Sequence, residues 1–219
     1  MDVRVAVVDD QVLIRAGLAA LLRAAPGIDV VGEAGSGEEA IRLASAQRPD
    51  VILMDIRMPG MSGITATERI LTGGEDAPKV IILTTFDLDE YVYNALRVGA
   101  SGFLLKDTPP ERLIAAVHTV ASGDILLAPV AIRRLIEAFN TPVAQTPPPS
   151  LAGLTARETE VVQLVGRALS NAQIAETLQV SEATVKTHLN RLMAKLGVCS
   201  RAQVVVVAYE CGLVKPGLR

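Results

Sequence analysis

The chain has 219 residues, half of them hydrophobic, and a formal net charge of −3. This length allows two small domains or one larger one. No apolar run reaches the ~18 residues that a membrane span needs, and the sequence does not open with the basic and apolar regions of an export signal. We therefore expect a soluble, cytoplasmic protein without membrane contact, in which Cys199 and Cys211 are reduced and have no redox or metal role.

Charge divides the chain into two unlike parts. Residues 1–140 contain 13 Lys and Arg against 19 Asp and Glu, whereas residues 141–219 contain 8 against 5. Four bases, Lys186, Arg191, Lys195 and Arg201, lie within sixteen residues that contain no acid. Such a cluster is typical of a surface that contacts phosphates, although charge alone also fits a solvated helix face.

The first part alternates strand and helix patterns, which favours a doubly wound α/β fold with a five-stranded parallel sheet. We expect strands at residues 3–8, 28–33, 51–54, 80–84 and 102–105. Helices are expected at residues 12–24, 37–47, 63–72 and 88–98, with a fifth after the last strand.

Three of the helix starts fit a capping box, in which a side chain that accepts a hydrogen bond precedes Glu by three positions. These pairs are Ser36 with Glu39, Asp87 with Glu90 and Thr108 with Glu111. In the last of them Pro109 would occupy the first helical position. Gly123 would end that fifth helix.

A helix at residues 125–139 and a proline-rich stretch at residues 140–150 follow. The prolines prevent regular structure and favour extended polyproline II geometry. We therefore expect one domain at residues 1–123, a linker helix and proline-rich linker at 124–150, and a second domain at 151–219.

The second domain is expected to be small and all-α. Thr155 with Glu158 fits a capping box for a helix that runs to about residue 169, and a short helix follows at 172–178. Ser181 caps a longer, basic helix that ends before Gly197. Two helices joined by a short turn, the second of them basic, predict a helix-turn-helix. A final helix is expected at residues 201–211, although its valine run suits a strand by propensity.

Polar residues end four of the expected strands. Asp9 and Asp10 follow the first, Asp55 the third, Thr84 the fourth and Lys106 the fifth. Ligands of a parallel sheet collect beyond the carboxyl ends of the strands, so we expect these groups to converge. Three close carboxylates repel one another unless a cation lies between them. Mg2+ takes oxygen ligands and is usually held by one or two carboxylates together with a phosphate.

These residues, together with the stretches 55–63 and 102–106, resemble a bacterial two-component receiver domain of flavodoxin-like fold, with strand order 2-1-3-4-5. Residues 154–214 resemble a LuxR-type helix-turn-helix domain. The whole chain thus resembles a response regulator of the NarL/FixJ class. The resemblance implies a DNA-binding transcriptional regulator and not an enzyme. Its partners would be a sensor histidine kinase and double-stranded DNA, and it would form a homodimer on phosphorylation.

The resemblance also assigns roles to the residues at the strand ends. Asp55 would accept the phosphoryl group. Mg2+ or Mn2+ would be held by Asp10, Asp55 and the main-chain carbonyl of Arg57, with Asp9 acting through water. Lys106 would pair with the phosphoryl group and Thr84 would hydrogen-bond it. Phe103 would be the aromatic residue that changes rotamer as Thr84 moves.

In the basic helix the resemblance places Lys186, Thr187 and Asn190 in the major groove, and their spacing puts them on one helix face. Asn190 departs from relatives that have Lys there, so their operator sequences need not apply. The remaining expected DNA contacts are Ser181, Thr184, Arg191 and Lys195, with phosphates as the partners of Ser181, Arg191 and Lys195.

Two other functions fit part of the pattern. An aspartate-dependent phosphatase or phosphotransferase also combines Asp, Thr and Lys with Mg2+, but it requires an acid two residues after the nucleophile, where this chain has Arg57. A phosphorelay intermediate or a protein-binding output would not touch DNA, and the basic helix argues against it.

Overall fold

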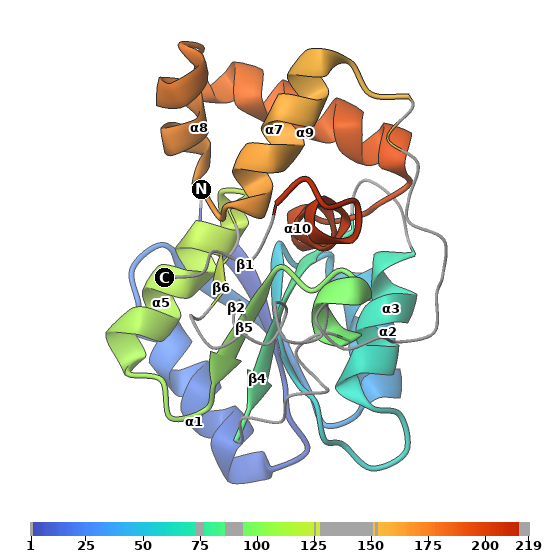
Figure 1. The fold of residues 1–219 in the computed structure, drawn as a ribbon. Coiled ribbons are helices and arrows are strands. Elements are labelled where there is room, and N and C mark those ends of the chain that lie inside the picture. The colour runs from blue at the N-terminus through green and yellow to red at the C-terminus, as the bar shows by residue number, and fades with distance from the viewer. Residues whose placement is uncertain are drawn as a thin grey trace.

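The structure is a computed structural model that describes residues 2–72, 77–85, 94–124, 126–127, 151 and 153–214. A parallel sheet lies at the centre of the larger part, which we call the α/β domain (Figure 1). Its strands are β1 (Val3–Val8), β2 (Ile28–Ala34), β3 (Val51–Asp55), β4 (Lys79–Thr84), β5 (Gly102–Leu105) and β6 (Leu126–Leu127). They pair in the order β2-β1-β3-β4-β5-β6, so the predicted order 2-1-3-4-5 is confirmed and β6 extends it.

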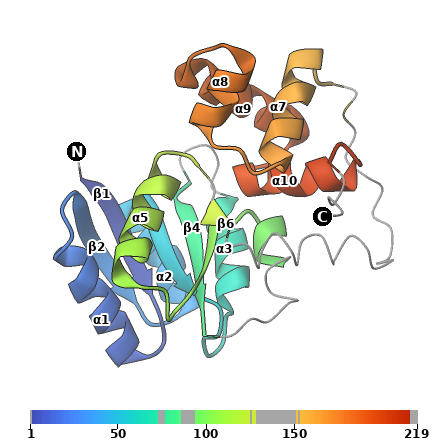
Figure 2. The same ribbon diagram turned by 60° about the vertical axis from the view of Figure 1, so that its left-hand side comes forward.

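Helices cover both faces of this sheet (Figure 2). The described helices are α1 (Val12–Arg23), α2 (Gly37–Gln47), α3 (Gly63–Leu71) and α5 (Pro110–Ala121), with a helical turn at residues 94–97. Because side chains alternate along each strand, Val5 and Val7 pack with α1 and α5 on one face. Ala6 and Val8 pack with α2 and α3 on the other face. The central strands are buried on both faces, as the continuous apolar runs predict.

In the smaller part, which we call the helical domain, the structure describes four helices. They are α7 (Ala156–Gly166), α8 (Asn171–Leu178), α9 (Glu182–Leu196) and α10 (Arg201–Glu210). Caps predicted from the sequence are confirmed at Ser36, Thr155 and Ser181, each of which accepts a hydrogen bond from the backbone N–H three residues on. Gly197 ends α9 with φ +66°.

The valine run in α10 is helical, since its side chains are buried among the other helices and burial outweighs β propensity there. Within the described residues no single helix is long and apolar enough to cross a membrane. Only α9 and α10 taken together pass that test, and they are bent by 62°.

Two predictions about the region around α5 are wrong. Thr108 does not cap α5, because the helix begins one residue later than predicted. Pro109 is its N-cap residue and Pro110 lies inside the first turn. Leu126 and Leu127 form strand β6 where a helix was expected. They lie beside the edge of β5, where their backbone pairs with Gly102 and Phe103. The rest of the expected helix 125–139, the linker 140–150 and the pair Asp87 with Glu90 lie outside the described residues.

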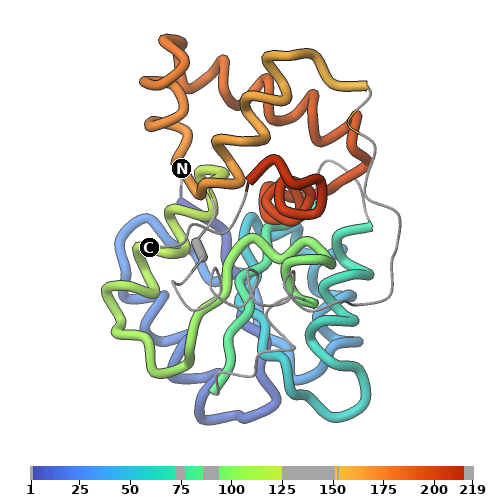
Figure 3. Tube along the Cα trace, in the orientation of Figure 1, coloured from blue at the N-terminus to red at the C-terminus, as the bar shows by residue number. Residues whose placement is uncertain are grey.

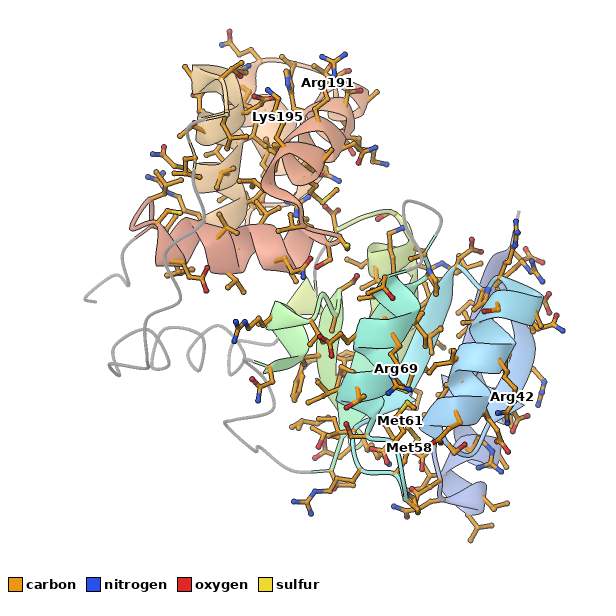
Figure 4. All side chains as sticks on the ribbon, turned by 90° about the vertical axis from the view of Figure 1, so that its right-hand side faces the viewer. Arg42, Met58, Met61, Arg69, Arg191 and Lys195 are labelled. Carbon is orange, nitrogen blue, oxygen red and sulfur yellow. The ribbon has the colours of Figure 1, made fainter. Side chains whose placement is uncertain are left out.

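The two domains meet at the amino-terminal ends of the strands. Figure 4 shows Met58 and Met61, in the loop that follows β3, at the end of the α/β domain far from the helical domain. The chain trace in Figure 3 shows α10 as the helix of the second domain that lies against the first. The carboxyl ends of the strands, where Asp55 lies, are therefore opposite to the domain contact.

Gly63, the first residue of α3, determines how closely that helix approaches β3. A Cβ atom at this position would lie 1.8 Å from the carbonyl oxygen of Asp55, whereas a Cβ atom at Gly17, in the exposed middle of α1, would meet nothing within 4 Å. We predict that Gly63→Ala lowers the free energy of unfolding by at least about 2 kcal/mol, because backbone must move. Gly17→Ala, the matched control, should raise it by about 0.5–1 kcal/mol.

Thermal unfolding followed by circular dichroism measures both changes. Equal melting temperatures for Gly63→Ala and the parent protein would contradict the close approach of α3 to β3.

Candidate functional site

The carboxyl ends of β1, β3 and β5 bring two acids and one base into contact. Lys106 Nζ lies 2.6 Å from Asp9 Oδ2 and 3.1 Å from Asp55 Oδ1. The three side chains are 8%, 1% and 6% exposed, respectively. Charges this well buried are stable only when they are paired, so the Lys106 ammonium is essential to the arrangement of both acids.

The backbone holds these side chains in place. The N–H of Asp9 donates to Ala34 O at 3.1 Å, which joins the end of β1 to β2, and the N–H of Lys106 donates to Thr84 O at 2.7 Å, which joins the end of β5 to β4. The N–H of Gln11 donates to Asp9 Oδ1 at 2.9 Å. The position of each functional group therefore follows from the strand that ends beside it.

The site has more negative than positive charge. Oxygen atoms of Asp9, Asp10 and Asp55 all lie within 4.8 Å of one another, and among the described residues Lys106 is the base whose side chain pairs with acids of this group. Burial raises the pKa of Asp55 above its ordinary value; Lys106 opposes this rise and Asp9 adds to it. Asp10 Oδ1 is buried and accepts no hydrogen bond from any described residue. An unpaired carboxylate oxygen beside two other acids fits a small divalent cation with oxygen ligands, such as Mg2+ or Mn2+.

The other residues predicted for this site lie around that cluster. Thr84 is 4% exposed at the end of β4. Phe103 belongs to the apolar core on the α3 face of the sheet and is buried. The Arg57 side chain is exposed, which leaves its main chain as the part that could face a metal.

The residues predicted to contact DNA lie on α9 and at its cap. Lys186, Thr187, Asn190 and Arg191 are exposed, whereas Val185, Leu189 and Leu192 of the same helix are buried. Ser181 Oγ accepts from the N–H of Thr184 at 3.1 Å and lies 2.9 Å from Thr184 Oγ1. The hydroxyl group of Ser181 thus caps α9, and the side chains of Lys186 and Arg191 on this helix are open to solvent.

Among the bases of α9, Lys195 has a partner inside the described part of the helical domain. Its Nζ lies 2.7 Å from Glu158 Oε2, and the same carboxylate accepts from the N–H of Thr155 at 2.7 Å. The hydrogen bond from Lys195, more than any other interaction, lowers the pKa of Glu158 to about 2. Lys195, which is labelled in Figure 4, therefore joins the end of α9 to the start of α7.

Comparison with known proteins agrees with this arrangement. The response regulator receiver domain family matches residues 5–118, and the luxR family of bacterial regulatory proteins matches residues 152–208. The uncharacterized transcriptional regulatory protein YxjL of Bacillus subtilis (strain 168) is 44% identical over 214 residues, which cover 97% of this chain and 98% of YxjL. The chain belongs to the response regulators with a LuxR-type DNA-binding domain.

Two further relatives cover nearly the whole chain. The nitrate/nitrite response regulator protein NarL of Escherichia coli (strain K12) is 34% identical and covers 93% of both chains. The crystal structure of ChrA, a response regulator in a heme-sensing two-component system, has 38% sequence identity and a TM-score of 0.54. It covers 97% of this chain and 99% of its own. The α/β domain is thus the receiver of this response regulator, and the helical domain is its DNA-binding domain.

Sequence reasoning missed two residues that position the receiver and DNA-binding sites. Arg15 donates through Nη1 to the carbonyl oxygen of Asp9 at 2.5 Å, and its Nε lies 3.7 Å from Glu33, so it supports the loop that carries the acids. Glu158 fixes Lys195. Its capping role was visible in the sequence, but no local pattern relates it to a base 37 positions away.

We predict that Mg2+ raises the melting temperature of the response regulator, because a ligand that binds only the folded state stabilises it by mass action. Asp10→Asn should remove most of this increase, since it takes one charge from the acid cluster. Asp107→Asn, which alters an exposed acid just after Lys106, should leave the increase unchanged. Thermal unfolding with and without about 10 mM MgCl2 measures the effect.

An equal increase in the parent protein and in Asp10→Asn would contradict metal binding by the acid cluster.

Proposed function

We propose that this response regulator is a cytoplasmic transcriptional regulator whose DNA binding is switched by phosphorylation of Asp55. The donor is a sensor histidine kinase, and the reaction depends on Mg2+ or Mn2+. The observation that supports this most is the buried Asp55 carboxylate, 3.1 Å from Lys106 and grouped with Asp9 and Asp10. We further propose that residues 1–123 form the receiver, 124–150 the linker and 151–219 the DNA-binding domain.

In the proposed reaction an oxygen of Asp55 attacks the phosphorus of a phosphohistidine, so that an O–P bond forms as the N–P bond breaks. Lys106 pairs with the phosphoryl oxygens. Asp9, Asp10, Asp55 and the Arg57 carbonyl would hold the metal, which supplies positive charge to the transferred group. Burial raises the pKa of Asp55, so the charged, nucleophilic form of this carboxylate depends on the cations beside it, Lys106 and the metal.

Control of DNA binding depends on a difference between the contacts that the phosphoryl group makes in two states of the receiver. Thr84 hydrogen-bonds the phosphoryl group, and Phe103 fills the space that the Thr84 side chain leaves. Phe103 lacks a hydroxyl group, so this switch is steric. The altered receiver then favours a homodimer, which presents two copies of α9 to half-sites about one helical turn apart.

A phosphatase or phosphotransferase that acts on small molecules is the second candidate. The cluster of Asp9, Asp10, Asp55 and Lys106 would suit it. The position of its general acid, however, is taken by Arg57, whose exposed side chain carries no proton that it could give up near neutral pH. We therefore favour the transcriptional regulator.

We predict that acetyl phosphate with Mg2+ adds one phosphoryl group to the parent protein and none to the Asp55→Asn variant. The amide of Asn cannot act as the nucleophile, although it keeps the size of Asp. Intact-protein mass spectrometry measures the added phosphate. A phosphate that is stable in acid and is lost in base identifies an acyl phosphate. Full labelling of Asp55→Asn, or labelling that survives removal of the metal by a chelator, would contradict the assignment.

For DNA binding we predict different effects of two exposed bases on α9. Lys186→Ala should cost about 1–3 kcal/mol on the specific site, because it removes a contact to a base edge. Arg191→Ala should weaken binding to all sequences alike and reduce the salt slope by about one unit, because it removes a phosphate contact. Arg191 is a better probe of phosphate binding than Lys195, whose ammonium is paired with Glu158.

Competition titrations of specific against random duplex at several salt concentrations separate the two effects. An unchanged ratio of specific to random binding in Lys186→Ala would mean that α9 does not present Lys186 to the bases.

A further inference from the structure

Arg15, in the first turn of α1, turns back towards the loop that carries two of the acids. Its Nη1 donates to the carbonyl oxygen of Asp9 at 2.5 Å, and its side chain is only 19% exposed. A guanidinium is planar and offers its donors in a fixed arrangement. The hydrogen bond from Arg15 therefore fixes the direction of the Asp9 carbonyl as well as its position.

This carbonyl belongs to the peptide group that joins Asp9 to Asp10, and a peptide group moves as one plane. On the other side of Asp9, its N–H donates to Ala34 O at 3.1 Å. Both backbone polar groups of Asp9 are thus bound, one to β2 and one to α1. Rotation of the peptide between the two acids is restricted, so Arg15 sets the direction in which Asp10 leaves the strand.

Asp10 depends on its backbone more than the other two acids do. Lys106 lies within ion-pairing distance of Asp9 and Asp55, and these contacts orient both carboxylates. Asp10 Oδ1, by contrast, is buried and accepts no hydrogen bond from any described residue. The peptide that precedes Asp10 is therefore the main constraint on where its carboxylate lies before a cation binds.

Glu33 holds the guanidinium of Arg15 from the other side. Arg15 Nε lies 3.7 Å from Glu33 Oε2, and Glu33 is paired in the sheet with Val7, two residues before Asp9. The second oxygen of the same carboxylate accepts from Arg23 Nη2 at 2.9 Å. Because Glu33 compensates the charge of Arg15, the guanidinium orients the acidic loop with little repulsion of a cation at the acids.

The loop between β2 and α2 closes over the same guanidinium. A Cβ atom at Gly35 would lie 3.3 Å from Arg15 Nη1, which is closer than an ordinary van der Waals contact. The N–H of Gly35 donates to Glu39 Oε2 at 2.7 Å, so this loop is held at its own end of α2. Arg15 is therefore enclosed by three segments, and its donor to Asp9 has little freedom to move.

We propose that Arg15 is a positioning residue for the divalent cation of the receiver. Through the Asp9 carbonyl it holds Asp9 and Asp10 in the geometry that the cation requires, and it touches neither the cation nor the phosphoryl group. Hydrogen bonds that orient metal ligands in this way change metal affinity by about 10- to 100-fold. This inference rests on the proposed function, in which Mg2+ or Mn2+ at the acids is needed for phosphorylation.

Charge and positioning predict opposite effects of removing Arg15. By charge alone, loss of one cation near three acids strengthens the binding of another cation. Loss of positioning weakens it, because the acids must then be ordered when the cation binds. A bound cation restores that order, so the defect falls on the affinity for the cation and not on the rate of phosphorylation at saturation.

The test measures Mn2+ binding to the full-length protein by electron paramagnetic resonance of the free ion. Arg15→Met keeps much of the apolar stem and removes the donor, and Arg15→Lys keeps the charge and one donor group. Arg23→Ala is the matched control, since the described partner of this more exposed base is the same Glu33. We expect the Mn2+ dissociation constant to rise about tenfold in Arg15→Met, less in Arg15→Lys and not at all in Arg23→Ala.

Labelling by acetyl phosphate gives a second readout. The Mg2+ concentration for half-maximal rate should rise by a similar factor in Arg15→Met, while the rate at saturating Mg2+ equals that of the parent protein. A role of Arg15 in stability alone would change neither quantity at a temperature where the variant is folded.

The outcomes separate this inference from the proposed function. If the parent protein binds Mn2+ and Arg15→Met binds it equally well or more tightly, the positioning role is wrong and the proposed function stands. An equal rise in Arg23→Ala would also overturn it, because the effect would then belong to Glu33. If circular dichroism shows that Arg15→Met does not fold, a dissociation constant of Arg15→Lys equal to that of the parent protein overturns the role. A parent protein that binds no Mn2+ refutes the metal-dependent reaction and the role of Arg15 together.

Discussion

The ammonium of Lys106, placed between Asp9 and Asp55, is the interaction on which the rest of the molecule depends. Three carboxylates converge at this edge of the sheet because the strands are parallel, and without Lys106 their mutual repulsion would destabilise the buried site. Lys106 also joins β5 to α5. The base that pairs with Asp55, the proposed phosphoacceptor, therefore lies in the loop between β5 and α5.

The sheet separates the chemistry from its output. Asp55 lies at the carboxyl end of β3, while Asp124 and Arg97 contact the helical domain. The helical domain lies at the opposite ends of the strands (Figure 1). A signal between them does not need a chain of polar contacts, because a rigid strand and a rigid helix already span the distance. The same geometry accounts for the exposure of α9: the receiver lies against α10 and leaves Lys186 and Arg191 of α9 open to solvent.

Much of this could be predicted from local sequence. Apolar runs that end in Asp9, Asp55, Thr84 and Lys106 locate the strands and the site, because period and strand-end chemistry are local properties. The helix expected at residues 126–127 was wrong because a partner distant in sequence decides: β6 forms beside the available edge of β5. The ion pair of Lys195 with Glu158, 37 positions apart, was not predicted for the same reason. The pairing of Arg201 with Asp124, 77 positions apart, leaves no local pattern.

The central claim, that phosphorylation of Asp55 alters the receiver beyond the acidic site, can be measured at one amide. The N–H of Asn171 donates to Asp124, so its hydrogen exchange reports on the domain contact directly. Hydrogen-exchange mass spectrometry should show faster exchange at the start of α8 when Asp55 is fully phosphorylated. Thr84→Ala, labelled equally, should show little change. Unaltered exchange there in fully phosphorylated wild-type protein would contradict the account.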